Sequence, residues 1–231
     1  MNAQQILFSQ GFGTRHECTG LILQGRFKVN GTLCEDPDEN IPTGNLVFSV
    51  DGVEWPYFEK AIILLNKPEH YECSLKPLHH PSVLSLLPPP LRTRKVQPVG
   101  RLDEDTTGLL ILTDDGQLNH RLTHPKRHVP KVYEVTLKHP ISQKQMTSLL
   151  KGVRLADSPE IVQAQACTKI SDHLIHLTVD QGKYHQIKRM LSAVSNRVEA
   201  LKRLRFGALE LPEGLKPGEW TWVKSQKDIL G

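Results

Sequence analysis

Apolar residues along the chain follow two patterns, and each pattern predicts a different kind of element. Short, fully apolar runs at Ala61–Leu65 and Leu109–Leu112 are typical of buried strands. The segments KVYEVTLK (131–138) and HLIHLTVD (173–180) alternate apolar and polar residues, as strands with one buried face do. In YHQIKRMLSAV (184–194) the apolar residues have the spacing of one helix face.

Two further helices are predicted in this part of the chain, one from Gln117 and one within SQKQMTSLLKG (142–152). Strands and helices therefore follow one another without a regular strand–helix–strand repeat. This order predicts a mixed α+β fold.

The first 50 residues predict two helices followed by a hairpin. Thr14 and Glu17 have the spacing of a capping box, which predicts a helix over 15–24 that ends at Gly25. Asn30-Gly31 joins two short β-prone runs and is a strong signal for a tight hairpin turn. A further strand is expected at 46–50, and residues 53–60 are expected to form a short link.

Composition places the chain among ordinary globular proteins. It has 231 residues, of which 38% are hydrophobic and 23% charged. No apolar run approaches the roughly 20 residues that cross a bilayer, and the N-terminus lacks a signal-peptide pattern. The four cysteines include no C-x-x-C pair, so neither a disulfide framework nor a cysteine-rich zinc site is indicated. We expect a cytoplasmic protein that does not associate with membranes.

Charge is distributed unevenly along the chain. Residues 1–60 contain 4 Lys/Arg and 8 Asp/Glu, whereas residues 61–231 contain 25 and 17. Within 183–205 there are seven basic residues and one acidic residue. This concentration suits a polyanionic partner such as RNA, although a solvated helix face would also produce it.

The segment Pro98–Gly116 carries the most informative pattern of polar residues. Arg101 and Asp103 lie in a charged turn that directly precedes a fully apolar strand, and Gly100 permits unusual backbone angles there. An unpaired carboxylate costs several kcal/mol to bury, so a carboxylate in such a place is expected to have a function. The residues alone leave open a polar turn, capped by Asp103 or Asp105.

The same segment resembles the signature of a known enzyme family. It contains G-R-L-D-x-x-T-x-G-L-L-x-L-T-x-D-G, which resembles the signature of the pseudouridine synthases typified by the enzyme of small-subunit ribosomal RNA. The resemblance implies that Asp103 is the catalytic residue and that Arg101 supports the motif. LNKP, which includes Lys67, resembles the family's first motif and implies support of the active site from a neighbouring strand. His70 stands where the family has glycine, so the resemblance does not define the local turn.

Two further motifs extend the resemblance. K-x-Y at 131–133 implies that Tyr133 stacks against the target base. GKYHQIKRM implies that Lys188 forms the ion pair with the catalytic aspartate, with Arg189 as its nearest rival, and that Ile187 lines the pocket. Lys183 replaces the more common arginine, which preserves the charge but loses the bidentate fork.

The N-terminal segment resembles the small RNA-binding domain named after a small-subunit ribosomal protein, through its helix–GR–VNG order. The resemblance implies RNA contacts from Arg15, Arg26 and Lys28. We therefore expect an RNA-binding domain at 1–55, made of two helices and a hairpin. A pseudouridine synthase domain with a largely antiparallel sheet is expected at 61–231.

The resemblance implies an isomerase that converts uridine to pseudouridine in ribosomal RNA, most simply that of the small subunit. The expected partner is ribosomal RNA or the assembling small subunit, and the protein is expected to be a monomer. Large-subunit RNA as substrate, and a non-catalytic RNA-binding or assembly protein, remain the alternatives. The reaction involves no redox change and no energy source, so we expect no cofactor and no metal. His120, His124 and His128 recur every fourth residue, but Pro125 interrupts the helix that would align them.

Overall fold

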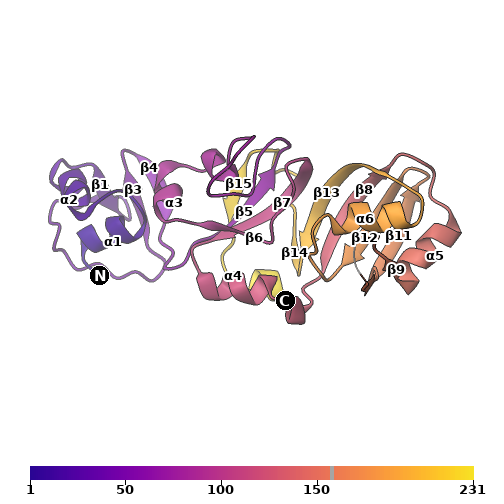
Figure 1. Ribbon diagram of the computed structural model, residues 1–231. Helices are drawn as coiled ribbons and strands as arrows, with labels where there is room; N and C mark the ends of the chain where they lie inside the picture. The colour runs from indigo at the N-terminus through magenta and orange to yellow at the C-terminus, as the bar shows by residue number, and fades with distance from the viewer. Residues whose placement is uncertain (157–158) are drawn as a thin grey trace. The chain divides into compact units, whose positions relative to one another are not determined.

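The computed structural model describes residues 1–156 and 159–231, which form two compact units (Figure 1). The first unit contains Met1–Ala61 and also Leu87–Val96, and the second contains Ile62–Leu86 and Gln97–Gly231. The domain limits 1–55 and 61–231 stay a prediction. The structure adds that a segment distant in sequence, 87–96, belongs to the first unit.

The first unit has the predicted order of two helices and a hairpin. Helices α1 (Ala3–Ser9) and α2 (Arg15–Leu23) both start with a capping box, which confirms the box predicted for α2. The antiparallel sheet has the order β2-β1-β3-β4. Its strands are β1 (Phe27–Val29), β2 (Thr32–Leu33), β3 (Val47–Val50) and β4 (Val53–Pro56).

The hairpin turn between β1 and β2 is the one that the sequence predicts. Asn30 and Gly31 both have positive φ, as a two-residue hairpin turn of this hand requires. The expected link at 53–60 is wrong in its first half, because residues 53–56 form β4. This strand pairs with β3 and presents Trp55 to the core of the unit.

Residues 87–96 are held to the first unit by polar contacts and by close packing. They include the short helix α3 (Pro89–Thr93). Arg94 donates hydrogen bonds to the Gln10 side chain (2.6 Å) and to the Phe58 carbonyl (3.0 Å). A Cβ at Gly11 would overlap the Pro90 carbonyl, so only glycine permits this approach.

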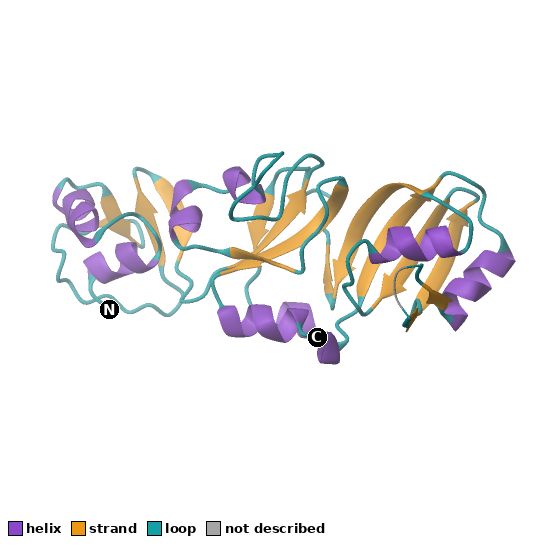
Figure 2. Ribbon diagram, viewed as in Figure 1, coloured by secondary structure: helices purple, strands orange, loops and turns teal. Residues whose placement is uncertain are grey.

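The second unit is built on a nine-stranded sheet with the order β11-β12-β8-β13-β7-β5-β15; β14 pairs with β13 and β6 with β7 (Figures 1 and 2). Its pairings are antiparallel except that between β13 and β7, which is parallel. The largely antiparallel sheet of the sequence prediction is therefore confirmed. The strands are β5 (Ile62–Lys67), β6 (Gln97–Val99), β7 (Thr106–Thr113), β8 (Lys131–Leu137), β11 (Ala166–Ser171), β12 (Leu174–Val179), β13 (Val198–Phe206), β14 (Leu209–Glu210) and β15 (Trp220–Trp222).

Helices pack beside this sheet, and a small separate ribbon pairs β9 (Val153–Arg154) with β10 (Ile161–Val162). Asp115 caps α4, while α6 packs against β9 and β13. The helices are α4 (Gly116–Thr123), α5 (Gln143–Lys151), α6 (Gln186–Ala193) and α7 (Lys227–Leu230), with 3-10 turns η1 (Val83–Leu86) and η2 (Pro125–Arg127). None of the helices in the described part of the chain is long and apolar enough to cross a membrane.

The strands at the centre of the sheet have the burial that their sequence patterns predict. Strand β5 is buried along its whole length, and β7 at all but one position, as their apolar runs predict. Strand β8 alternates between buried and half-buried residues, again as predicted. Strand β13 was not predicted, because its apolar residues are interrupted by Lys202, Arg203 and Arg205.

Candidate active site

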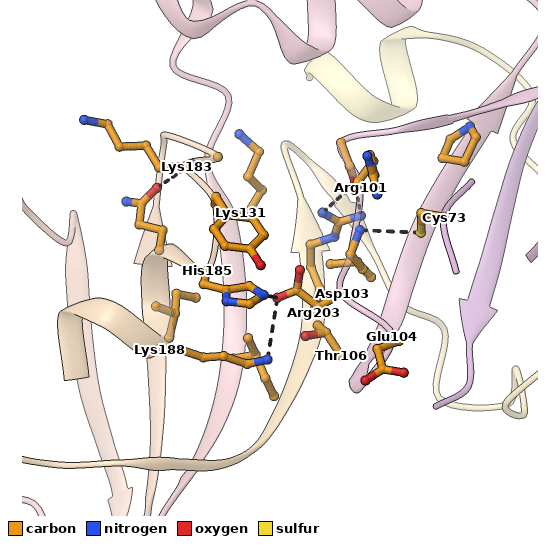
Figure 3. A pocket seen from close by; sticks show the side chains of 18 of the residues that line it. Cys73, Arg101, Asp103, Glu104, Thr106, Lys131, Lys183, His185, Lys188 and Arg203 are labelled. Carbon is orange, nitrogen blue, oxygen red and sulfur yellow. Dashed lines mark hydrogen bonds and ion pairs between the residues drawn. The ribbon is translucent and has the colours of Figure 1, made fainter. Parts of the chain in front are cut away.

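A cavity of about 1020 Å³ opens at the start of β7 in the second unit (Figure 3). Its walls come from the loop 100–104, from β8 and β13, and from the segment that leads into α6. The cavity is lined by four residues that come from separate sequence motifs: Asp103, Tyr133, Ile187 and Lys188. The fold therefore brings together residues that are up to 85 positions apart.

Lys67 fixes the loop that carries Asp103 from the side of β5. Its side chain is fully buried, and its ammonium donates hydrogen bonds to the carbonyls of Pro68 (3.0 Å), Glu104 (3.0 Å) and Thr106 (2.9 Å). Burial lowers the pKa of Lys67, while nearby carboxylates, including Asp105 and Asp103, oppose that shift. The predicted supporting role of the LNKP motif thus has a concrete geometry, three bonds to backbone oxygens.

Arg203 holds the same loop from the side of β13. It is 1% exposed, and its guanidinium donates to the carbonyls of Leu109 (2.7 Å) and Gly100 (3.2 Å from each terminal nitrogen). Sheet register places Arg203 opposite Tyr133 of β8 and opposite Gly108 of β7. A Cβ at Gly108 would overlap the Arg203 backbone, so glycine is required where β7 meets β13.

Two basic side chains from the start of α6 face the Asp103 carboxylate. His185 Nε2 lies 3.5 Å and Lys188 Nζ 3.6 Å from the same oxygen, Oδ2 (Figure 3). Lys188 is closer to Asp105, with 2.7 Å to each carboxylate oxygen. The resemblance implied an ion pair of Lys188 with Asp103 alone. The structure instead shows Lys188 shared between two carboxylates, with the shorter bonds going to Asp105.

The electrostatics of Asp105 agree with this sharing. Burial raises the pKa of Asp105, but the Lys188 ammonium that is hydrogen-bonded to it more than offsets burial, and the net pKa is lowered. Asp105 therefore stays ionised at neutral pH and keeps Lys188 beside Asp103.

The rest of the predicted pocket has both apolar and polar walls. Tyr133 and Ile187 are buried (9% and 4% exposed) and line the cavity, as a stacking and a packing residue would. Arg101 is exposed on the cavity wall. Arg189, the rival for the ion-pair role, donates a hydrogen bond from one terminal nitrogen to the Tyr184 carbonyl (3.0 Å).

Lys131 adds a cation to which the sequence motifs gave no role. It lines the cavity, is 8% exposed, and its ammonium lies 3.4 Å from the Asp180 carbonyl. Burial lowers the pKa of Lys131 to about 8; the positive charge of Arg203 adds to the shift, and Asp180 opposes it.

The predicted RNA-binding residues lie at several places. In the first unit, Arg15 stacks over the Phe8 ring (4.8 Å), Arg26 forms two 2.7 Å bonds with Asp51, and Lys28 is exposed. In the second unit, Lys183 lines the cavity and pairs with Glu160. Arg203 belongs to the basic cluster 183–205 that we expected to face RNA, but its burial removes it from that surface.

Sequence reasoning gave no active-site role to Asp105, His185, Lys131 or Arg203. His185 and Lys131 belong to motifs that the resemblance did identify, so their positions were visible but not their roles. The alternation of strand residues between two faces could have identified Arg203 as buried, because Arg203 lies on the same face of β13 as the buried Leu201. Asp105 follows Asp103 by two residues, and the sequence does not distinguish which of them Lys188 contacts.

The histidine series around Pro125 does not converge in space. The His120 and His124 rings lie 5.1 Å apart at α4, whereas His128 follows Pro125 with a positive φ and contacts Asp180. His70 also has a positive φ, of 64°. The turn after LNKP is therefore of the kind glycine adopts most easily, although histidine stands there.

Residues 61–193 match the RNA pseudouridylate synthase family, and residues 1–47 match the S4 domain. The chain belongs to the pseudouridine synthase family and carries an N-terminal S4 domain; it is an enzyme of the isomerase class.

Proteins of this family match the chain over almost its whole length. A protein of Yersinia pestis called ribosomal small subunit pseudouridine synthase A is 43% identical, covering 97% of this chain and 93% of its own. A Bacillus subtilis protein called uncharacterized RNA pseudouridine synthase YtzG is 37% identical, covering 98% and 96%. A crystal structure of a pseudouridylate synthase superposes with a TM-score of 0.70 at 32% identity, covering 99% and 98%.

Proposed function

We propose that this enzyme converts a uridine of ribosomal RNA, in the small subunit, to pseudouridine, with Asp103 as its catalytic carboxylate. The observation that carries the proposal is the convergence of Asp103, Lys188 and Tyr133 on one cavity. The small-subunit substrate is supported by the name of the Yersinia relative and by the S4 domain. Acting on ribosomal RNA implies a cytoplasmic location, and one cavity within a single chain is consistent with a monomer.

The chemistry breaks the bond between N1 of uracil and C1′ of ribose, rotates the base, and joins C5 to C1′. The proton of C5 is lost to solvent, and N1 gains one, so the atoms balance without any co-reactant. Asp103 acts as nucleophile or general base, and therefore has to be ionised within the cavity. Lys188 Nζ and His185 Nε2 lie 3.6 Å and 3.5 Å from its Oδ2, where they can stabilise the carboxylate.

Tyr133 supplies a flat, buried face against which the detached uracil can stack, a contact worth roughly 1–3 kcal/mol. The target nucleotide has to leave its helical stack to reach this face. Lys131 and Lys183 on the cavity wall, and Arg15, Arg26 and Lys28 of the first unit, are our candidates for holding the RNA backbone.

Release of tritium from [5-³H]uridine-labelled RNA by the purified enzyme tests this proposal, because joining C5 to C1′ frees the label from C5. We expect release from small-subunit RNA, or from its assembling particle, and not from large-subunit RNA. Release from large-subunit RNA alone would reassign the substrate. RNA binding without release from either would favour a non-catalytic assembly protein. Mapping pseudouridines in ribosomal RNA of cells with and without the gene identifies the modified position.

A further inference from the structure

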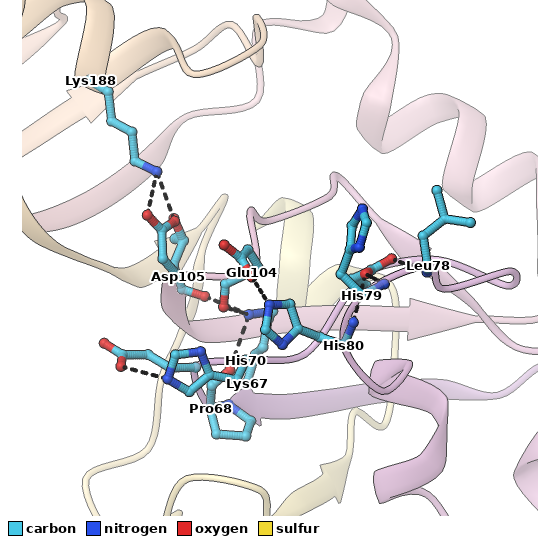
Figure 4. A network of polar contacts seen from close by, with 12 residues as sticks. Lys67, Pro68, His70, Leu78, His79, His80, Glu104, Asp105 and Lys188 are labelled. Carbon is cyan, nitrogen blue, oxygen red and sulfur yellow. Dashed lines mark hydrogen bonds and ion pairs between the residues drawn. The ribbon is translucent and has the colours of Figure 1, made fainter.

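Outside the catalytic contacts, two histidines and a glutamate converge on the rim of the cavity. Each of His70, His80 and Glu104 offers one ligand atom, and these atoms lie within 4.8 Å of one another. Within the described residues this is the only group of three or more His, Cys, Asp or Glu side chains so arranged. Figure 4 shows both rings beside the Glu104 carboxylate. We propose that His70, His80 and Glu104 bind a divalent transition-metal ion, of which Zn²⁺ fits the ligands best.

The ligand types favour zinc over the hard cations. Two imidazoles and one carboxylate are a common ligand set of open zinc sites, in which water completes a tetrahedron. Bonds of about 2.0–2.1 Å place tetrahedral ligands roughly 3.4 Å apart, so the three groups need to close by at most about 1.4 Å.

The backbone around the three ligands is already fixed. The His70 N–H donates to the Glu104 carbonyl (2.9 Å), and Lys67 donates to the same oxygen. The Glu72 carboxylate accepts the backbone N–H groups of Leu78, His79 and His80 at 2.7–3.0 Å, which lower the pKa of Glu72 to about 2. The loop that presents His80 is thereby held at the strand end that presents His70.

No single ion pair accounts for the cluster. His80 Nε2 contacts the Glu104 carboxylate, and the His70 ring centre lies 5.6 Å from that of His80. His70 adopts a left-handed backbone, which is strained for a residue with a β-carbon. The Glu69 carboxylate, 3.9 Å from His70 Nε2, adds negative charge beside the cluster.

The site is accessible from solvent and adjacent to the chemistry. The side chains of His70, His80 and Glu104 are 71%, 34% and 49% exposed. Glu104 directly follows Asp103, so an ion would tie the catalytic loop to the segment 69–80 at the edge of the cavity, which His80 and Glu104 line. This departs from our expectation of a metal-free protein, but the ion would take no part in the isomerisation.

Titration of the full-length protein with Zn²⁺ by calorimetry, and with Co²⁺ by visible absorption, tests the site without RNA. We expect one equivalent to bind, with intense tetrahedral Co²⁺ bands. His70→Gly should weaken binding at least about 10-fold while leaving the fold intact, since glycine suits a φ of 64°. His80→Gln and Glu104→Gln should weaken it similarly.

His79→Gln is the matched control, because His79 is the exposed neighbour on the same loop and lies outside the cluster. It should bind Zn²⁺ as the wild type does. Absence of binding in the wild type, or equal loss in His79→Gln and His70→Gly, would overturn the proposal. Neither result bears on tritium release, so the zinc site and the proposed function fail separately.

Discussion

The arginines predicted to bind RNA in the first unit and the buried cations of the second unit are chemically alike but differently placed. Arg15 and Arg26 lie on the surface, and Arg26 pairs with Asp51, which is itself half exposed. Lys67 and Arg203 are buried and donate to backbone carbonyls around the Asp103 loop. Exposed cations act mainly through long-range electrostatics that salt screens, whereas buried cations define the geometry of a loop. The same residue types should therefore respond differently to substitution and to salt.

The largest effect among these cations is expected for Arg203→Met. Methionine fills a similar volume but leaves the carbonyls of Leu109 and Gly100 without their charged donor. We expect a loss of about 3 kcal/mol of unfolding free energy and a single-turnover rate at least about 100-fold lower. Urea denaturation and single-turnover tritium release measure the two effects.

Arg205→Met is the control for this experiment. Arg205 lies two residues along β13, and its side chain is 42% exposed. Its substitution should change stability by less than about 0.5 kcal/mol. Equal effects of the two substitutions would show that Arg203 has no special part in holding the loop.

A smaller, salt-dependent effect is expected when Arg15, Arg26 and Lys28 are all replaced by Gln. Removing residues 1–60 would be a cruder test, because Arg94 and its neighbours would lose their partners in the first unit. The triple variant should raise the apparent KM about 10-fold and leave the saturating single-turnover rate unchanged. The slope of the logarithm of RNA affinity against the logarithm of salt concentration should become less negative by about 2. Each phosphate that the variant no longer neutralises accounts for roughly 0.7 of this change.

The matched control replaces three exposed lysines of the second unit with Gln: Lys216, Lys224 and Lys227. It changes the net charge by the same amount as the first triple variant. If this control raises KM equally, the first unit is not the capture surface. A lower saturating rate in the first triple variant would instead give these residues a part in catalysis.

The smallest effect concerns Lys131, whose pKa of about 8 lies below that of an ordinary lysine. As pH rises through about 8, Lys131 loses its charge and RNA affinity should fall about fivefold, equivalent to roughly 1 kcal/mol for one charged contact. Binding of RNA to Asp103→Asn enzyme between pH 6.5 and 9.5 measures this. Lys131→Arg should remove the decline; an unchanged decline would assign it to another group.

The same shift has a consequence for stability. Between pH 8 and 10.5 the unfolded chain keeps a proton on Lys131 that the folded chain has lost, so this group makes stability rise with pH across that window. Below pH 8 the buried ammonium is destabilising. Lys131→Met should accordingly raise the melting temperature at pH 7 while weakening RNA binding, and this gain should disappear near pH 10.5.

Sequence patterns predicted the elements whose periodicity is strong. The Thr14–Glu17 capping box, the Asn30-Gly31 turn and the apolar runs of β5 and β7 were all predicted correctly. Strand β13 was missed, because a buried arginine breaks the apolar alternation on which strand prediction depends. The period of two places Arg203 on the buried face of β13, but the carbonyls that it contacts come from β7 and from Gly100, and no local pattern identifies these partners.

The candidate site, too, could be predicted only in part from the sequence. Motifs identified which segments meet, and the fold does bring Asp103, Tyr133, Ile187 and Lys188 to one cavity. The partition of Lys188 between Asp103 and Asp105 depends on differences of about 1 Å, which spacing along a chain does not encode. The His70–His80–Glu104 cluster likewise arises from tertiary contacts, because Glu72 folds the loop that presents His80.

Comparing Asp103→Asn with Asp105→Asn tests the central claim most directly, because both substitutions remove one carboxylate from the same loop. The measurement is single-turnover tritium release with saturating enzyme. Asp103→Asn should bind RNA normally and lose at least about 10³-fold in rate, since an amide is neither nucleophile nor base. Asp105→Asn should stay within about 10-fold of wild type, because Lys188 can then pair with Asp103 alone. Turnover by a homogeneous Asp103→Asn enzyme, or a loss confined to Asp105→Asn, would contradict the assignment of Asp103.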